Sequence, residues 1–154
     1  LTRTLARTAA PLRPVLVLNA NHGHEIDDAV GAALAPLRAA GVTLLNQAVL
    51  LRGVNDRVEA LAALSEALFA HGVLPYYLHL LDPVAGAAHF DVPEAEARAL
   101  VAALQARLPG YLVPRLAREE NGRSSKTVLA PERPSYRQRH RPAPAAGEGL
   151  EGMR

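Results

Sequence analysis

The stretch Leu74–Phe90, LPYYLHLLDPVAGAAHF, decides the fold because its first half has the pattern of a buried strand and its second half follows with functional groups. Leucines with tyrosine and histidine between them match a strand in length and apolar content. Asp82 stands where that strand should end. In parallel β/α proteins, side chains at the carboxyl ends of strands line the ligand crevice. The alternative is that the tyrosines are core residues and Asp82 is a turn residue before Pro83.

Similar apolar runs of strand length recur on both sides of this stretch, with helical patterns between them. We expect strands to begin near residues 15, 42, 73 and 111. Each intervening segment carries apolar residues at helical spacing, bounded by Asp, Pro or Gly residues that typically cap or end helices. Pro36 falls inside the first of these helices and predicts a bend or a short helix. The alternation predicts an α/β fold with a parallel sheet, either open or part of a barrel.

The length and composition divide the chain into three parts. With 154 residues the chain can bury one core, but it is short of the roughly 200–250 residues of a complete β/α barrel. We expect a lead-in at 1–14, the β/α part at 15–128, and a disordered Pro-, Arg- and Gly-rich basic tail at 129–154. Cysteine is absent, which excludes disulfides and thiolate metal sites. No signal peptide or membrane-spanning pattern is present, so a cytoplasmic protein that does not contact membranes is expected.

Polar side chains follow or interrupt the other expected strands. The loop after the first strand carries a cluster of five, Asn19, Asn21, His22, His24 and Glu25. Histidines two residues apart do not share a helix face, which argues against a helical zinc site and leaves a loop metal site as a minor alternative. In the second strand, Asn46 and Gln47 bring amides into an apolar run. Buried amides require hydrogen bonds, so these residues predict a ligand or a polar network.

Lys126 is the only lysine in a chain whose other basic residues, apart from histidine, are all arginine. Arginine stays protonated in proteins, whereas a desolvated lysine can lose its proton and form a Schiff base with an aldehyde cofactor. The chain therefore has one candidate for amine chemistry. The alternative is an ordinary solvated lysine in a polar loop.

Five separated motifs stand out in chain order: NQAVLLRGVND (46–56), PYYLHLLD (75–82), GAAHF (86–90), GYLVPRLARE (110–119) and SKT (125–127). Together they resemble the lysine 2,3-aminomutase family, most closely the branch that makes β-lysine for elongation factor P. The resemblance covers about residues 15 to 128. It implies the C-terminal part of a partial, TIM-like β/α barrel in a radical S-adenosylmethionine enzyme. Such enzymes use a [4Fe-4S] cluster and pyridoxal phosphate to move the α-amino group of lysine to the β-carbon.

The same resemblance implies roles for individual residues. Lys126 would form the Schiff base with pyridoxal phosphate. Asp82 and Glu119 would hold the ammonium group of the substrate lysine. The residues bordering the cofactors would be Asn19, Gln47, Tyr76 and His79.

The sequence also departs from the family pattern in two places. The family holds its cluster with a CxxxCxxC motif, and this chain has no cysteine, so we expect a C-terminal portion that is inactive by itself. Relatives usually carry a histidine at the position of Asn19 and a Pro–Asn pair at the positions of Gly23 and His24. These changes fall on the expected cofactor edge of the site.

A second class of function is a non-catalytic β/α binding module whose basic tail contacts RNA or a protein partner. Eight basic and only three acidic residues lie between Arg115 and Arg141. Tyr136 is the one aromatic residue of the tail, which argues against RNA. For the aminomutase, the implied partners are the small-molecule substrate lysine, elongation factor P and its lysyl-transferring enzyme. Oligomerisation stays open.

Overall fold

The computed structural model describes residues 12–131 except 84, 121 and 123. The strands are β1 (Val15–Leu18), β2 (Thr43–Val49), β3 (Leu74–His79), β4 (Arg115–Arg118) and β5 (Thr127–Val128). The helices are α2 (Asp28–Ala39), α3 (Val58–Ala70) and α4 (Glu94–Arg107), with short 3-10 turns η1 (Gly23–Glu25), η2 (Ala88–Phe90) and η3 (Gly110–Leu112). The lead-in at 1–11 and the tail at 132–154 lie outside the described residues.

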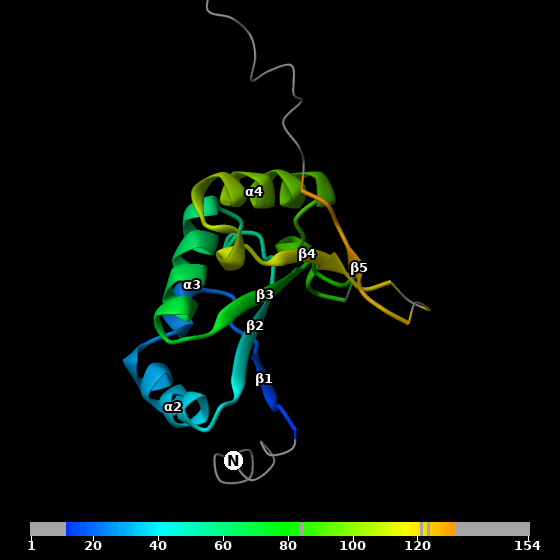
Figure 1. Cartoon of the computed structure of the whole chain (residues 1–154). Coiled ribbons are helices and arrows are strands. Elements are labelled where there is room, and N and C mark those ends of the chain that lie inside the picture. The colour runs from blue at the N-terminus through cyan, green and yellow to red at the C-terminus, as the bar shows by residue number, and fades with distance from the viewer. Residues whose placement is uncertain (1–11, 84, 121, 123, 132–154) are drawn as a thin grey trace, which may run out of the picture.

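The strands form one sheet in the order β1-β2-β3-β4-β5 (Figure 1). The first four strands are parallel, which confirms the predicted α/β fold, and β5 runs antiparallel to β4. β4 begins at Arg115 and not near residue 111, because η3 and Pro114 occupy the positions before it. Proline cannot donate to a strand ladder, so pairing begins after it. The sequence reading missed β5.

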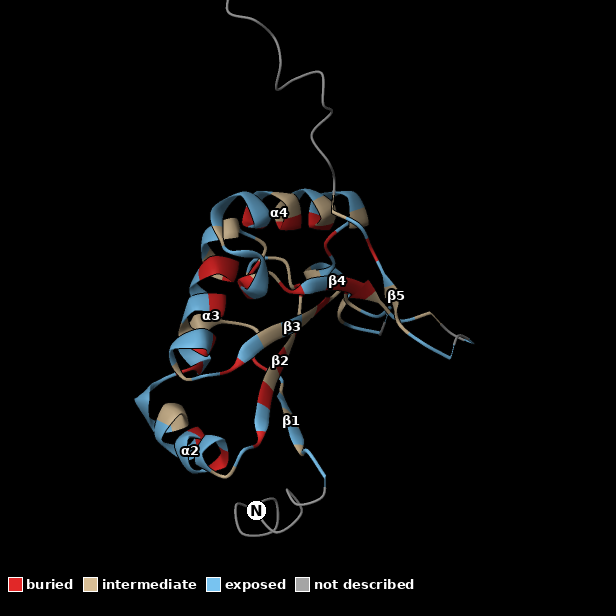
Figure 2. Ribbon diagram, in the orientation of Figure 1, coloured by how far each residue is buried: buried red, intermediate tan, exposed pale blue. Residues whose placement is uncertain are grey.

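The helices α2, α3 and α4 follow one side of the curved sheet (Figure 1), and their apolar faces form the core with alternate residues of the strands. In β2, for example, Leu44, Asn46 and Ala48 are buried while the residues between them are partly exposed. Figure 2 shows the buried positions of α3 and α4 turned toward the strands. On β1, at the edge of the sheet, Val15 and Val17 remain exposed.

Two local expectations need correction. The helix α2 extends three residues beyond Pro36, so proline does not shorten it. Proline lacks the amide that would donate to the carbonyl of Ala32, so α2 continues past Pro36 with one intrahelical hydrogen bond fewer. Leu129, expected to begin the tail, is buried in the core, and its amide donates to the carbonyl of Leu116. Among the described residues, no helix is long and apolar enough to cross a membrane.

Candidate functional site

A cavity of about 370 Å³ lies at the carboxyl edge of the parallel strands. It is lined by Asn19, Asn21, Gln47, Ala48, Val49, His79, Leu80, Leu81, Asp82, Glu119 and Lys126. Apart from Lys126, the lining comes from the ends of β1 to β4 and from the residues just after them. This is the edge where parallel β/α proteins bind ligands, and the volume falls within the range of small-molecule sites.

Lys126 reaches the same edge because β5 is antiparallel to β4. Glu119 directly follows β4, and Lys126 directly precedes β5. In an antiparallel pair the end of one strand lies beside the start of the next, as the pairing of Arg118 with Thr127 shows. Two residues seven positions apart in the sequence are thereby brought into contact.

Lys126 and Glu119 form an ion pair, with the lysine ammonium donating a hydrogen bond to the glutamate carboxylate. This hydrogen bond is the main cause that lowers the pKa of Glu119, and the positive charge of Lys126 is the second. The ammonium also lies 5.9 Å from the centroid of the Tyr77 ring. The amine thus sits between an acid and an aromatic face.

His79 lies beside this pair. Burial lowers the pKa of His79, and the positive charge of Lys126 lowers it further, so both favour the uncharged form of the ring. Its Nε2 atom is buried and has no hydrogen-bond partner within the part of the chain that the structure describes. Buried polar atoms are normally paired, so this nitrogen is suited to a hydrogen bond with a ligand.

Amide side chains fix the loops that surround the cavity. Asn46 is buried and bonds both the amide and the carbonyl of Ala20, so the predicted polar network exists at this position. Gln47 donates to the side-chain oxygen of Asn19 over 2.9 Å. The side-chain oxygen of Asn21 accepts a hydrogen bond of 2.7 Å from the amide of Val49. These contacts tie the loop after β1 to β2.

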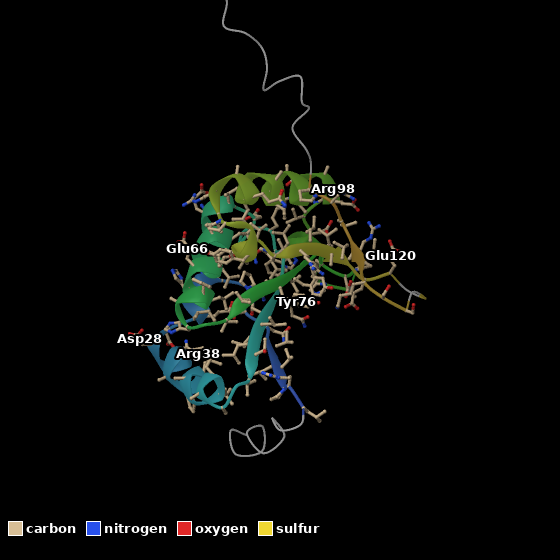
Figure 3. All side chains as sticks on the ribbon, in the orientation of Figure 1. Asp28, Arg38, Glu66, Tyr76, Arg98 and Glu120 are labelled. Carbon is tan, nitrogen blue, oxygen red and sulfur yellow. The ribbon has the colours of Figure 1, made fainter. Side chains whose placement is uncertain are left out.

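The predicted site residues, apart from Tyr76, all line the cavity. A register shift explains the exception: Asn46 pairs with Pro75 and Gln47 pairs with Tyr77, which leaves Tyr76 without a partner in β2. The ring of Tyr76 lies near the guanidinium of Arg115, on the strand side of the molecule (Figure 3). Tyr77, which also does not line the cavity, lies against His79 with 5.5 Å between the ring centroids.

Asn55 is the important residue that sequence reading did not single out as part of the site. It is fully buried, accepts from the amide of Leu51, and donates to the carbonyls of Asn21 and Val49. Its signals were its place in the loop after the second strand and in the motif NQAVLLRGVND (46–56). The loop histidines form no metal site with other residues, since no group of three candidate ligands occurs among the described residues.

The Lys126→Met substitution is expected to raise the pKa of Glu119 toward the ordinary value of 4.5. Methionine keeps much of the side-chain volume but removes the donor and its charge. A carbon-13 NMR titration of the Glu119 carboxyl group measures the change. Because the folded-state pKa is lowered, the ion pair stabilises the fold above about pH 4.5 and loses this contribution as pH falls through the folded-state pKa.

The matched control for this titration is Arg107→Met, which removes a cation paired with Glu59 at 3.5 Å on the helices. It should leave the pKa of Glu119 unchanged. A pKa of Glu119 that stays low in Lys126→Met would contradict the contact between the two side chains.

Comparisons with known proteins identify relatives over most of this chain, although no family model matches it. It is 56% identical over 118 residues to L-lysine 2,3-aminomutase of Escherichia coli K12, covering 77% of this chain and 34% of the relative. It is 51% identical over 119 residues to L-lysine 2,3-aminomutase of Haemophilus influenzae, covering 77% of this chain and 35% of the relative. The chain thus spans about a third of the length of these relatives.

Among solved structures, the fold is similar to that of a radical SAM methyltransferase from Sphaerobacter thermophilus. The TM-score is 0.53 at 18% sequence identity, and the match covers 79% of this chain and 39% of the other. This likeness concerns the fold, and it agrees with the expected partial barrel.

Proposed function

The chain belongs to the lysine 2,3-aminomutase family, and on this basis we propose that it is part of a pyridoxal phosphate-dependent radical S-adenosylmethionine enzyme that converts L-α-lysine to β-lysine. The observation that carries the proposal is the convergence of one amine and two carboxylates on one cavity. Lys126, Asp82 and Glu119 come from separate places in the sequence and all line it. An amine and two acids suit an aldehyde cofactor and a substrate with an additional ammonium group.

The lining of the cavity fits pyridoxal phosphate. Lys126 offers the only side-chain amine of the chain for bonding to the aldehyde carbon. His79 offers a ring nitrogen that has no partner among the described residues, and Gln47 and Asn19 offer amide groups in the same lining. When bound, the cofactor would supply a conjugated ring that stabilises an unpaired electron during the migration of the amino group.

The two carboxylates suit the ammonium at the end of the substrate lysine. Charged hydrogen bonds from an ammonium to carboxylates are stronger than neutral ones, and two carboxylates on different loops fix its direction. Glu119 already binds one ammonium, that of Lys126. When Lys126 turns toward the cofactor, Glu119 becomes available to a second cation. Binding of cofactor and binding of substrate are then linked through one carboxylate.

The [4Fe-4S] cluster does not fit the residues of this chain. The sequence contains no cysteine, and the described residues contain no group of three candidate metal ligands. A [4Fe-4S] cluster held by cysteines therefore needs ligands from another segment. We therefore expect no activity from this chain alone. We also propose that the β-lysine serves the modification of elongation factor P in the cytoplasm. The motif resemblance supports the link to elongation factor P.

A chimeric enzyme tests the proposal. The matching segment of the Escherichia coli relative, 118 residues, is replaced by that of this chain. The chimera, with iron, sulfide, S-adenosylmethionine, reductant and pyridoxal phosphate, should form β-lysine, which mass spectrometry detects. This chain alone, under the same conditions, should give no more product than a sample without protein. A chimera that assembles its cluster yet forms no β-lysine would contradict the proposal.

A further inference from the structure

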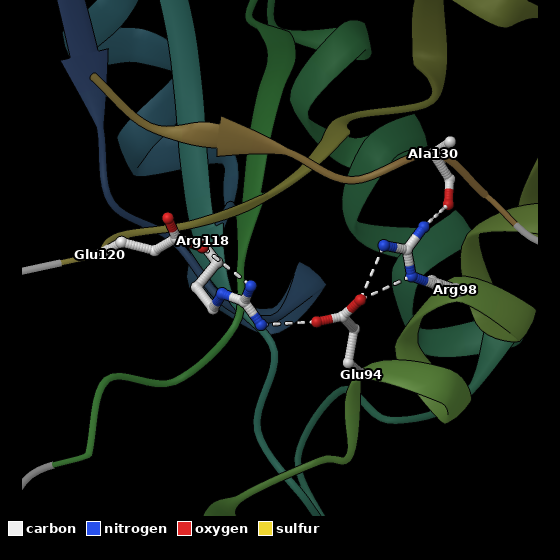
Figure 4. Close-up of polar contacts among 5 residues, drawn as sticks. All are labelled: Glu94, Arg98, Arg118, Glu120 and Ala130. Carbon is white, nitrogen blue, oxygen red and sulfur yellow. Dashed lines mark hydrogen bonds and ion pairs between the residues drawn. The ribbon is translucent and has the colours of Figure 1, made fainter. Parts of the chain in front are cut away.

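Glu94, the first residue of α4, joins two arginines that come from different elements (Figure 4). One carboxylate oxygen accepts from Arg98 over distances of 2.8 and 2.7 Å, and the other accepts from Arg118 over 2.6 Å. A carboxylate at a helix N-terminus is also favoured by the helix dipole. Each oxygen of Glu94 thus serves a different guanidinium group.

The two arginines contact the polypeptide on both sides of Lys126, before it at Glu120 and after it at Ala130. The residues between these two contacts are called the Lys126 segment. Arg118, the last residue of β4, also donates to Glu120 over 2.8 Å. Arg98 also donates to the backbone carbonyl of Ala130, just beyond β5. Figure 4 shows these contacts as one continuous chain from Glu120 through Glu94 to Ala130. Entry to the segment and exit from it are therefore fastened to the same helix end.

The site residues lie between these fastened points. Glu119 stands between Arg118 and Glu120, and alternate residues of an extended chain point to opposite sides. Arg118 and Glu120 bond each other, whereas Glu119 lines the cavity and contacts Lys126. The side chains of Arg118 and Glu94 are 42% and 33% exposed, and ion pairs this exposed contribute little to stability. A role in geometry explains the arrangement better than a role in stability.

We propose that Glu94 is a positioning residue that, through Arg118 and Arg98, holds the Glu119 carboxylate against the Lys126 amine at the cavity. The catalytic importance of the Glu119 carboxylate and the Lys126 amine rests on the proposed function. Their geometry does not depend on that function, because it is a property of this chain without cofactor or substrate.

The test measures the pKa of Glu119 by carbon-13 NMR in the full 154-residue chain. In Glu94→Gln the network loses its central charge, and we expect the pKa of Glu119 to rise toward the value found in Lys126→Met. The sign is decisive. Removing a nearby negative charge would by itself lower the pKa of Glu119, so only loss of contact with Lys126 produces a rise. An unchanged or lower pKa in a folded Glu94→Gln chain would overturn the proposal.

The matched control is Glu59→Gln, which changes a glutamate in the first turn of α3 that also pairs with an arginine. It should leave the pKa of Glu119 unaltered, and a rise equal to that of Glu94→Gln would overturn the proposal. If Glu94→Gln does not fold, Arg98→Lys serves instead, because it keeps the charge while a lysine cannot bond Glu94 and Ala130 as the planar guanidinium does. A smaller rise is expected, and no rise would overturn the proposal.

The two proposals fail separately in these experiments. The titration needs neither cofactor nor turnover. An unchanged pKa of Glu119 in Glu94→Gln would therefore contradict the positioning role of Glu94 without affecting the test of the aminomutase function by the chimera. A chimera without β-lysine combined with the expected pKa rise would remove the aminomutase function and leave the role of Glu94 intact.

Discussion

Lys126→Ala is expected to reduce β-lysine formation by the chimeric enzyme to background. The physical reason is that Lys126 is the only lysine of this chain. Its amine is the group beside Glu119, His79 and the Tyr77 ring. An arginine cannot replace it, since arginine does not lose its proton in proteins. Product measured by mass spectrometry, with cluster content and S-adenosylmethionine binding checked by absorbance and calorimetry, gives the result.

Lys126→Arg is the control that separates chemistry from structure. Arginine keeps the positive charge and can still pair with Glu119, so the cavity edge should remain folded and the pKa of Glu119 should stay low. Activity should nevertheless be absent. If Lys126→Arg retained turnover while Lys126→Ala lost it, Lys126 would act through its charge, and the assignment of amine chemistry would be wrong.

Chemical trapping gives a readout that does not depend on turnover. The chimera is reduced with borohydride in the presence of pyridoxal phosphate and then analysed by peptide mapping. The pyridoxyl group should be found on Lys126. The α-amino terminus competes, since its reference pKa of about 7.7 makes it nucleophilic at neutral pH. Acetylation of the terminus by an N-terminal acetyltransferase, which leaves the side-chain amine of Lys126 free, removes this competitor. A pyridoxyl group found elsewhere in the chimera would show that Lys126 is an ordinary loop residue.

The parallel sheet was predictable because its signals are local. Apolar runs of strand length alternate with helical patterns such as that of α3, where Leu61, Leu64 and Leu68 form one buried face. The carboxyl-edge location of Asp82 and His79 follows from the order of the elements, since strands that run in the same direction end at the same edge. These features need no knowledge of which atoms touch.

The features that sequence reading missed depend on pairing between distant segments. Tyr76 was expected at the cavity, but the register between β2 and β3 shifts opposite it, and its ring lies near Arg115 and not in the cavity lining. No local pattern indicates where a strand changes register. The contact of Glu119 with Lys126 likewise depends on β5 pairing antiparallel to β4, and a strand of two residues has almost no sequence signal. The resemblance to aminomutases supplied the residues, whereas the strand topology explains their meeting.

Asn55→Ala is expected to destabilise the fold by about 3 kcal/mol. Asn55 is fully buried, and its loss leaves the amide of Leu51 and the carbonyls of Asn21 and Val49 without their partner. Each buried polar group left unsatisfied costs about 1–3 kcal/mol, and water entering the gap recovers part of this cost. Urea unfolding measures the change in the free energy of unfolding.

Asn19→Ala is the matched control, because it removes an amide at the same edge that has one side-chain contact, with Gln47. Its effect on the free energy of unfolding should stay below about 1 kcal/mol. If both variants lose the same amount, the buried network is not what holds this edge together. The Asn55 bonds also fix Asn21 and Val49, which line the cavity. Asn55→Ala should therefore weaken pyridoxyl labelling of Lys126 even under conditions where the chain remains folded. If the variant unfolds more easily but is labelled normally, Asn55 contributes to the stability of the fold and not to the geometry of the cavity.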